Sequence, residues 1–534
     1  MEYFEIEKDN DKQKINKTHI KGKKDKNCNL GYLIGFIVLL IGIILIIYNN
    51  LPEKNKKISK ESNDKNNKIA EEKSKNNTNI EENKTEDKYN LESIKNEPNL
   101  FTQYILSLFR NANNLDLTIF NKNLNKIKQK IYYIIKNKKE NEDLYIILST
   151  IYGAFLADSM GSFCEFKSFN KNNHLSIFNI NSNRIFKPGQ VTDDSEMAMS
   201  QAYAIMDNSN YKTLNKHLIY YYYLIWYNSH PLDIGMTTRN ALNIINLDNK
   251  INITNKYIFS EEIKNYVSRK NYASLANGLL MRISPLLTWF YITNKYYIKE
   301  ILESKSYDKF YELYNTILKE VEKDSQLTHP NRENAVAGSI FIFMGICAME
   351  QKYSGKEILE MIKILFKHND FNQLKEEKIL KNHFDSILND FEKNDFNEDA
   401  YFGDLSNLMG YYLHAFKLTL YYLYNFEKMK KTINVKHLYN NIMFSICDFG
   451  GDTDTNAAIV GMIIGPLIGL QNFNNEYFET FLNFYSKDRI IYTNAFMYFY
   501  ANYLINIEKN TSITENKVNF NFYKMIYDML NKEL

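Results

Sequence analysis

The chain reads Gly-Gly-Asp-Thr-Asp-Thr at residues 450–455, and the apolar stretch Asn-Ala-Ala-Ile-Val-Gly follows at 456–461. A second cluster, Thr-Asp-Asp at 192–194, stands in the same way before Met-Ala-Met-Ser at 197–200. Asp and Thr side chains accept hydrogen bonds from the free N–H groups of a first helical turn, and Asp complements the positive end of the helix dipole. Each cluster alone therefore predicts the start of an apolar helix.

Together, the two clusters supply four carboxylates and two hydroxyls, which are the hard oxygen ligands that Mg²⁺ and Mn²⁺ prefer. The set consists of Thr192, Asp193, Asp194, Asp452, Asp454 and Thr455. A calcium loop of the EF-hand type is excluded, because Ala457 stands where that loop needs Gly and Ile463 stands where it needs Glu. The sequence therefore favours a magnesium or manganese site over a calcium loop.

The overall charge and the cysteine positions argue against a nucleic-acid-binding protein, a disulfide-linked protein and a zinc protein. The chain of 534 residues has 66 Lys and Arg against 63 Asp and Glu, a formal net charge of +3. No strong basic footprint is present, so we expect no binding to duplex nucleic acid. The four cysteines at 28, 164, 347 and 447 are scattered and indicate neither a disulfide framework nor a zinc site.

The first hundred residues predict a membrane-anchored tether. Residues 1–29 are polar and Lys-rich, and we expect them to be disordered. Residues 30–48 form an uncharged apolar run, which as a helix reaches about 28 Å and can cross a bilayer core of about 30 Å. A buried core helix and a cleaved signal peptide are the alternatives. Residues 49–100 read as a polar linker.

The side of the membrane is indicated by the flanking lysines. Seven Lys lie within 11–29 and five within 49–66, which favours a cytoplasmic N-terminus and places the bulk of the chain in a lumen or outside the cell. Sequons at Asn76 and Asn83 fit that side. The sequence thus predicts a single-pass membrane protein.

The remainder of the chain predicts an all-α architecture. Residues 101–140 read as a helical lead-in, and residues 141–534 read as one helical domain in which long apolar-periodic stretches alternate with short polar breaks. Gly recurs every fourth residue at 461, 465 and 469, so a second backbone can approach this face closely. Pro466 is expected to kink or locally break that helix. We expect this helical domain to be monomeric.

Six stretches, in this order, resemble the ADP-ribosylglycohydrolase family, with some similarity to the branch that removes ADP-ribose from serine. They are Gly153–Phe166, Gly189–Met197, Asp233–Arg239, Asn277–Leu286, Thr328–Pro330 and Gly450–Thr455. The resemblance implies two metal ions, usually Mg²⁺ with Mn²⁺ as the alternative, at the bottom of an ADP-ribose cleft. The six oxygen residues above would be ligands, and Glu165 would close over one metal and take part in catalysis.

The same resemblance implies the substrate contacts. A loop that cradles the diphosphate would include Asn277, Gly278, Leu279, Met281 and Arg282, and His329 would contact the ligand. Other readings stay open. Arg282 can be a structural ion pair, His329 a capping or buried residue, Glu165 a loop carboxylate, and Asp158 either a cap or a support for the ligands.

The chain departs from the family pattern in this loop. Ala276 replaces a Gly, and Leu279 and Leu280 replace small residues. A Cβ at position 276 could hinder a backbone conformation that Gly allows, so a loss of affinity or activity is expected here if that conformation is needed.

The implied function is a Mg²⁺-dependent hydrolase that cleaves at C1″ of ADP-ribose on a modified protein or a related small molecule. Glu165, Asp193 and Asp194 are the candidate catalytic carboxylates. The alternative is a non-catalytic ADP-ribose-binding or structural relative with the same fold.

Overall fold

The computed structural model describes residues 98–179, 181, 185–244, 258–510 and 522–534. These residues belong to one compact unit, Tyr89–Leu534. The predicted tail, transmembrane helix and nearly all of the polar linker lie outside the described residues.

Within the described ranges every regular element is a helix, which confirms the all-α prediction. The one extended pairing there is an isolated antiparallel bridge between Ala276 and Tyr411. The α-helices are α4 (Pro98–Arg110), α5 (Thr118–Lys136), α6 (Glu142–Gly161), α7 (Asp193–Met206), α8 (Lys216–Asn228), α9 (Met236–Leu242), α10 (Glu261–Asn271), α11 (Ser284–Thr293), α12 (Lys295–Ser304), α13 (Tyr307–Thr328), α14 (Arg332–Met349), α15 (Gly355–Leu365), α16 (Asp370–Gln373), α17 (Lys375–Phe391), α18 (Glu398–Phe402), α19 (Tyr412–Thr432), α20 (Val435–Phe449), α21 (Thr453–Ile468), α22 (Asn475–Asn483), α23 (Met497–Asn510) and α24 (Phe522–Asn531).

Short 3₁₀ segments connect several of these helices. They are η2 (Ala112–Asn114), η3 (Lys138–Glu140), η4 (Asn173–Ser176), η5 (Asn277–Arg282), η6 (Leu470–Asn472), η7 (Lys487–Tyr492) and η8 (Asn494–Phe496). Of these, η5 borders the candidate site, because it contains the predicted diphosphate loop.

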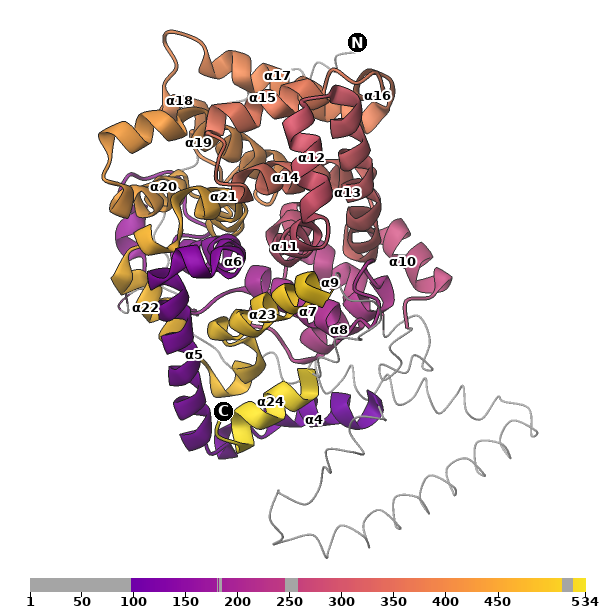
Figure 1. Cartoon of the computed structure of the whole chain (residues 1–534), viewed down its shortest axis with the longest axis vertical. Helices are drawn as coiled ribbons and strands as arrows, with labels where there is room; N and C mark the ends of the chain where they lie inside the picture. The colour runs from indigo at the N-terminus through magenta and orange to yellow at the C-terminus, as the bar shows by residue number, and fades with distance from the viewer. Residues whose placement is uncertain (1–97, 180, 182–184, 245–257, 511–521) are drawn as a thin grey trace, which may run out of the picture. The chain divides into compact units, whose positions relative to one another are not determined.

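Helices α6 and α21 form the most extensive helix–helix contact in the described unit (Figure 1). They meet backbone to backbone: a Cβ built on Gly461 would lie 2.1 Å from the carbonyl oxygen of Gly153, and one on Gly153 would lie 2.9 Å from the Cα of Gly465. Only glycine permits this separation, because real Cβ contacts do not come so close. The predicted small face of α21 is confirmed at Gly461 and Gly465.

Of the kink or local break expected at Pro466, the break is not found, since α21 runs from Thr453 to Ile468 with Pro466 inside it. Proline removes one backbone donor and crowds the preceding turn. Because Pro466 stands in the last turn, only one intrahelical bond near the helix end is lost, and the helix stops soon afterwards at Gly469, where φ is +82°.

Two described helices, α6 and α14, are long and apolar enough to cross a membrane by length and composition. Their apolar windows are 94% and 89% buried within the protein, which is what core helices of a globular domain show. They are therefore weak evidence for a membrane span.

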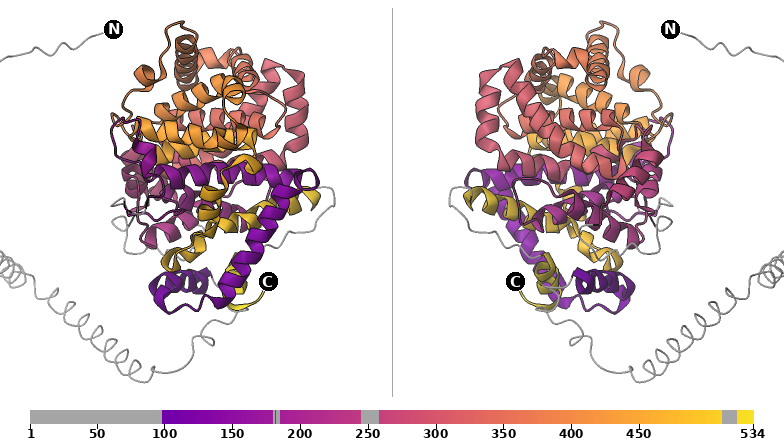
Figure 2. Two further views of the ribbon diagram at one scale, coloured as in Figure 1. Left: turned by 90° about the vertical axis from the view of Figure 1, so that its left-hand side faces the viewer. Right: turned by 90° about the vertical axis from the view of Figure 1, so that its right-hand side faces the viewer.

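Helices α4 and α5, from the predicted lead-in, lie together with α24 at one end of the described unit (Figures 1 and 2). Asn123 of α5 donates to the carbonyl oxygens of Met529 and Lys532 through its amide nitrogen. The apolar side of α5, including Phe120 and Ile131, is buried. The lead-in helices thus share a core with the C-terminal helix.

Replacement of Gly461 by Ala should destabilise the protein by about 2 kcal/mol or more, because the added methyl group meets a rigid backbone carbonyl. The better helix propensity of Ala, worth about 1 kcal/mol, opposes this loss only in part. Urea unfolding measures the difference. Gly235→Ala is the matched control, since a Cβ there has no atom within 4 Å. An unchanged urea midpoint for Gly461→Ala would disprove the close contact.

Candidate metal centre

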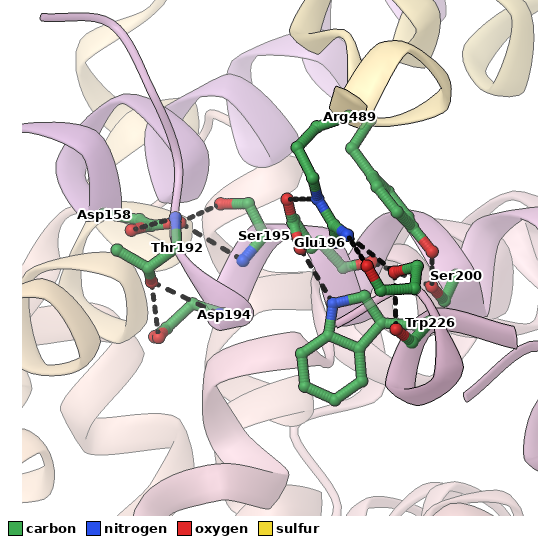
Figure 3. Close-up of polar contacts among 10 residues, drawn as sticks. Asp158, Thr192, Asp194, Ser195, Glu196, Ser200, Trp226 and Arg489 are labelled. Carbon is green, nitrogen blue, oxygen red and sulfur yellow. Dashed lines mark hydrogen bonds and ion pairs between the residues drawn. The ribbon is translucent and has the colours of Figure 1, made fainter. Parts of the chain in front are cut away.

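The N-terminus of α7 is held by a carboxylate from α6. Both oxygens of Asp158 accept from the backbone N–H of Thr192 at 3.1 Å, and Oδ2 also accepts from the N–H of Ser195 at 3.2 Å and from the Ser195 hydroxyl (Figure 3). Thr192 is the N-cap, and its hydroxyl accepts from the N–H of Asp194. Asp158 therefore positions the whole Thr-Asp-Asp cluster from the neighbouring helix.

The turn before α21 is clamped between two loops. Gly450 and Gly451 have φ of +73° and +77°, and a Cβ on either would fall within 2.3 Å of a carbonyl oxygen, that of Lys167 or of Leu405. The Phe166 N–H donates to the Gly451 oxygen at 2.9 Å, and the Gly451 N–H donates back to the Lys167 oxygen at 2.8 Å. These bonds hold the segment after α6 against the start of α21.

The helix starts bring the carboxylates into two groups of three. Asp158, Asp194 and Asp454 offer oxygens within 4.8 Å of one another, and Glu165, Asp452 and Asp454 form a second such group. Asp454 belongs to both groups, so it is the one carboxylate that could bridge two ions. The clusters at 192–194 and 450–455 are therefore adjacent in the fold.

The hydrogen bonds of Asp194, as well as its position, fit a site for a divalent cation. Oδ2 of Asp194 accepts from the hydroxyls of Thr192 at 3.1 Å and Thr455 at 3.3 Å. Oδ1 of the same side chain is buried and has no hydrogen-bond partner. An orphaned buried carboxylate oxygen is costly unless a cation or water completes it. Oδ1 of Asp194 is thus an oxygen that could ligate a cation.

Burial and mutual repulsion make the ionised carboxylates of the centre unfavourable. Burial raises the pKa of Asp194 and Asp454 well above the usual range, and neighbouring carboxylates raise it further. Burial also raises the pKa of Asp158 to about 6, against the opposing effect of its hydrogen bonds from Ser195 and Thr192. A bound cation would offset the repulsion between these carboxylates by its positive charge.

Asp193 lies outside both groups of three. Its Oδ2 accepts from the backbone N–H of Gly235 at 3.2 Å, just before α9. Burial raises its pKa well above the usual range, with Asp233 as the next contributor. The structure therefore places Asp193 on the side of the centre that faces the 233–235 loop.

The predicted diphosphate loop reaches the centre through Asn277. Its side-chain amide donates to Oδ2 of Asp452 at 2.6 Å, and its backbone N–H donates to the Gly410 oxygen at 2.8 Å. Ala276 has φ −72° and ψ 149°, an ordinary extended conformation. The expected hindrance by a Cβ at this position is therefore absent.

The two leucines that depart from the family pattern do not obstruct the centre. Leu279 and Leu280 are buried, and their Cδ2 atoms lie 3.4 and 3.6 Å from where a Cβ on Gly338 of α14 would stand. They fill the interior against that glycine. The predicted ligand contact of Leu279 is therefore not one that its side chain makes from the surface.

Arg282, predicted to bind phosphate, is fully buried. Its guanidinium donates to Asp324 at 3.1 Å, to the Gly278 oxygen at 2.8 Å and to the Thr328 hydroxyl at 2.7 Å. Three of the five N–H groups of Arg282 are thus bonded within the protein, so Arg282 forms the structural ion pair that stood as the alternative, and its contact with phosphate stays a prediction. The His329 ring lies directly against Gly278, 2.7 Å from where a Cβ would be.

Comparisons with known proteins assign the chain to a family. The family model described as ADP-ribosylglycohydrolase matches residues 141–495. This chain belongs to the ADP-ribosylglycohydrolase family. It is 28% identical over 331 residues to a protein of Acanthamoeba polyphaga mimivirus that carries the name ADP-ribosyl glycohydrolase L543, covering 60% of this chain and 86% of the relative. Family and relative identify the chain as a glycosidic-bond hydrolase of the ADP-ribosylglycohydrolase type.

A solved structure titled ADP-ribosylglycohydrolase-related protein complex matches over 68% of this chain and 99% of its own, at 16% identity and a TM-score of 0.42.

For an ADP-ribosylglycohydrolase, the structure bears on one reading left open by the sequence: Asp158 caps the start of α7 and also belongs to a carboxylate group. It also adds Glu196, which the sequence did not single out and which holds α7 by an ion pair with Arg489 and a 2.8 Å bond from the Trp226 indole (Figure 3). Glu196 stands two positions after Asp194, and this closeness in sequence is the signal that could have pointed to it. Arg489 lies 293 positions further on, and no local pattern points to it.

Metal-free protein should lose stability as the pH rises. Asp158, Asp194 and Asp454 have folded pKa values above the unfolded value of about 3.9, so the folded state binds more protons over that interval. The free energy of unfolding therefore falls as the pH climbs from about 4 through 6 and beyond. Added Mg²⁺ should raise the melting temperature more at about pH 8 than at about pH 5, as calorimetry with Mg²⁺ or EDTA would measure.

Asp454→Asn supplies the internal comparison. It removes the shared carboxylate, so it should be more stable than the parent in EDTA at about pH 8 and should lose most of the gain from Mg²⁺. Asp390→Asn, whose carboxylate pairs with Lys393 away from the centre, should behave as the parent does. Undiminished stabilisation of Asp454→Asn by Mg²⁺ would remove these carboxylates from the metal site.

Proposed function

We propose that the chain is a Mg²⁺-dependent hydrolase that cleaves the bond at C1″ of ADP-ribose on a modified protein or a related ADP-ribosyl compound. The observation that carries the proposal is the shared Asp454, which joins two carboxylate groups into a centre suited to two ions. Mn²⁺ is the alternative metal. The residues that would hold the ions are Glu165, Thr192, Asp193, Asp194, Asp452, Asp454 and Thr455, with Asp158 added from the structure.

When bound, Mg²⁺ supplies a Lewis acid that orients the ribose hydroxyls and lowers the pKa of a water molecule. The protein's own contribution begins with orientation. Thr192 and Thr455 fix the Asp194 carboxylate, and Asn277 fixes that of Asp452. Asn277 also ties the substrate loop to the centre, so a ligand held by Gly278, Leu279 backbone and Met281 would be placed against the carboxylates.

Glu165 is the proposed proton carrier. It is buried, and its carboxylate lies within 4.8 Å of oxygens of Asp452 and Asp454. Its position follows from the bonds that join Phe166 and Lys167 to Gly451. A carboxylate held at the centre can take a proton from the attacking water or give one to the leaving group, in a reaction that resembles glycoside hydrolysis. Asp193 and Asp194 are the remaining candidates for this role.

Glu165→Gln should lower the single-turnover rate of ADP-ribose release by about 10²–10⁴-fold, the usual contribution of a general acid or base. Binding of ADP-ribose, measured by calorimetric titration, should fall much less. Glu392→Gln, an exposed substitution at the end of α17, controls for the loss of a carboxylate elsewhere. Equal losses of rate and affinity would indicate a structural or metal-holding role instead.

The acceptor is found by incubating the full-length protein with Ser- and Arg-ADP-ribosylated peptides and with free ADP-ribosyl compounds, in Mg²⁺ or in EDTA. Release in Mg²⁺ alone supports the proposal. If the protein binds ADP-ribose but releases none from any acceptor, the non-catalytic alternative replaces the hydrolase.

We also propose that residues 30–48 anchor the enzyme as a single transmembrane helix, with the catalytic domain lumenal or extracellular. The proposal rests on the uncharged apolar run and the flanking lysines. Full-length protein should stay in the membrane fraction after carbonate extraction, whereas a chain that starts near Tyr89 should not. Extraction of the full-length protein by carbonate would refute the anchor, and unmodified Asn76 and Asn83 in a glycosylating host would argue against the proposed side.

A further inference from the structure

The hydroxyl of Thr328, at the C-terminus of α13, lies between two nitrogen groups. Nη2 of Arg282 is 2.7 Å from Oγ1, and Nδ1 of His329 is 2.8 Å from the same atom. All three residues are buried. Arg282 is held in this position by Asp324, by the Gly278 carbonyl oxygen and by the ring of Tyr223, whose centroid is 4.8 Å from Cζ.

The chemistry of these groups fixes the direction of each hydrogen bond. A guanidinium can only donate, so Thr328 Oγ1 accepts from Arg282. The hydroxyl proton then needs an acceptor, and Nδ1 of His329 is the acceptor that the structure provides. If Nδ1 carried a proton instead, both neighbours would donate to Oγ1, and a buried O–H would lack an acceptor, which costs stability. Nδ1 is therefore the unprotonated nitrogen.

A neutral imidazole with an unprotonated Nδ1 carries its proton on Nε2. The ring is neutral, because burial and the adjacent Arg282 charge lower the pKa of His329 well below its usual value. Nε2 lies beside Gly278, 2.7 Å from where a Cβ would stand, and that position is also 3.6 Å from the Thr238 hydroxyl. Among the described residues the structure records no hydrogen-bond partner for Nε2, although His329 retains a small accessible surface.

We propose that Arg282 and Thr328 act as positioning residues that hold His329 as the neutral Nε2–H tautomer, so that this N–H donates to a phosphate or ribose oxygen of bound ADP-ribose beside Gly278. The identity of the ligand rests on the proposed function, whereas the tautomer does not. Arg282 would thus affect the ligand without touching it, because its charge keeps the His329 ring neutral and its hydrogen bond to Thr328 places the ring proton on Nε2.

The first test is NMR of full-length protein labelled with ¹⁵N in histidine, in which correlations from the ring protons distinguish the two nitrogens. His329→Gln identifies the signals that belong to this residue. We expect Nδ1 to show the shift of an unprotonated nitrogen and Nε2 that of a protonated one. A protonated Nδ1 in the parent protein would overturn the proposal.

Two substitutions of Thr328 separate the effect of its hydrogen bonds to Arg282 and His329 from a general loss of packing. Thr328→Val keeps the shape but removes the hydroxyl, so it should move the tautomer signals towards protonation at Nδ1. Thr328→Ser keeps the hydroxyl and should restore the parent spectrum. An unchanged His329 spectrum in Thr328→Val would overturn the role of Thr328.

The hydrogen bond from Nε2–H of His329 to the ligand is tested by calorimetric titration with ADP-ribose. Thr328→Val should bind on the order of tenfold more weakly than the parent, and Thr328→Ser should bind within a few-fold of it, as expected for one hydrogen bond to a charged group. Equal affinity of the parent and Thr328→Val would overturn donation by Nε2–H. If the parent binds no ADP-ribose, the proposed function fails, and the spectra alone decide the tautomer.

Discussion

The approach of α6 to α21 is the constraint on which the metal centre depends. Gly153 faces Gly461 and Gly465 without side chains between them, so the two helix axes lie closer than helices with ordinary residues could. Asp158 and Glu165 come from α6 and its following turn, whereas Asp452 and Asp454 come from the start of α21. A wider separation would part these carboxylates and leave no group of three within reach of one ion.

The same closeness makes the centre electrostatically unfavourable without metal. The fold places several carboxylates in one buried region, and burial opposes their ionisation. Stability and function are thus coupled: the contacts that assemble the centre concentrate negative charge, and a cation relieves it. The ion pair of Glu196 with Arg489 behind α7 shows the contrasting solution, in which the protein supplies the positive charge itself.

Much of the site could be predicted from the sequence, because its parts are helix starts with a local signature. The pairing of the clusters at 192–194 and 450–455 came from their common oxygen chemistry and from the order of family motifs. The role of Arg282 could not be decided, since its partner Asp324 lies 42 positions away on another helix. The effect of Ala276 depended on a backbone conformation that residue type alone does not reveal. The direction of Leu279 and Leu280 depended likewise on the space left by Gly338.

The glycine contact also limits how the protein can recover from mutation. An overpacked core is commonly relieved by shortening the side chain that faces the new one. At Gly153 the nearest facing atoms all belong to the main chain of α21, and at Gly461 the nearest is the Gly153 oxygen, 2.1 Å from where a Cβ would stand. The Cβ of Ala157, at 2.9 Å, is the one side-chain atom among the three nearest to Gly461, and its removal would leave the Gly153 oxygen in place. A second mutation that rescues a substitution here would have to move a whole helix. The contact between Gly153 and Gly461 should therefore tolerate neither a single substitution nor a substitution of both glycines.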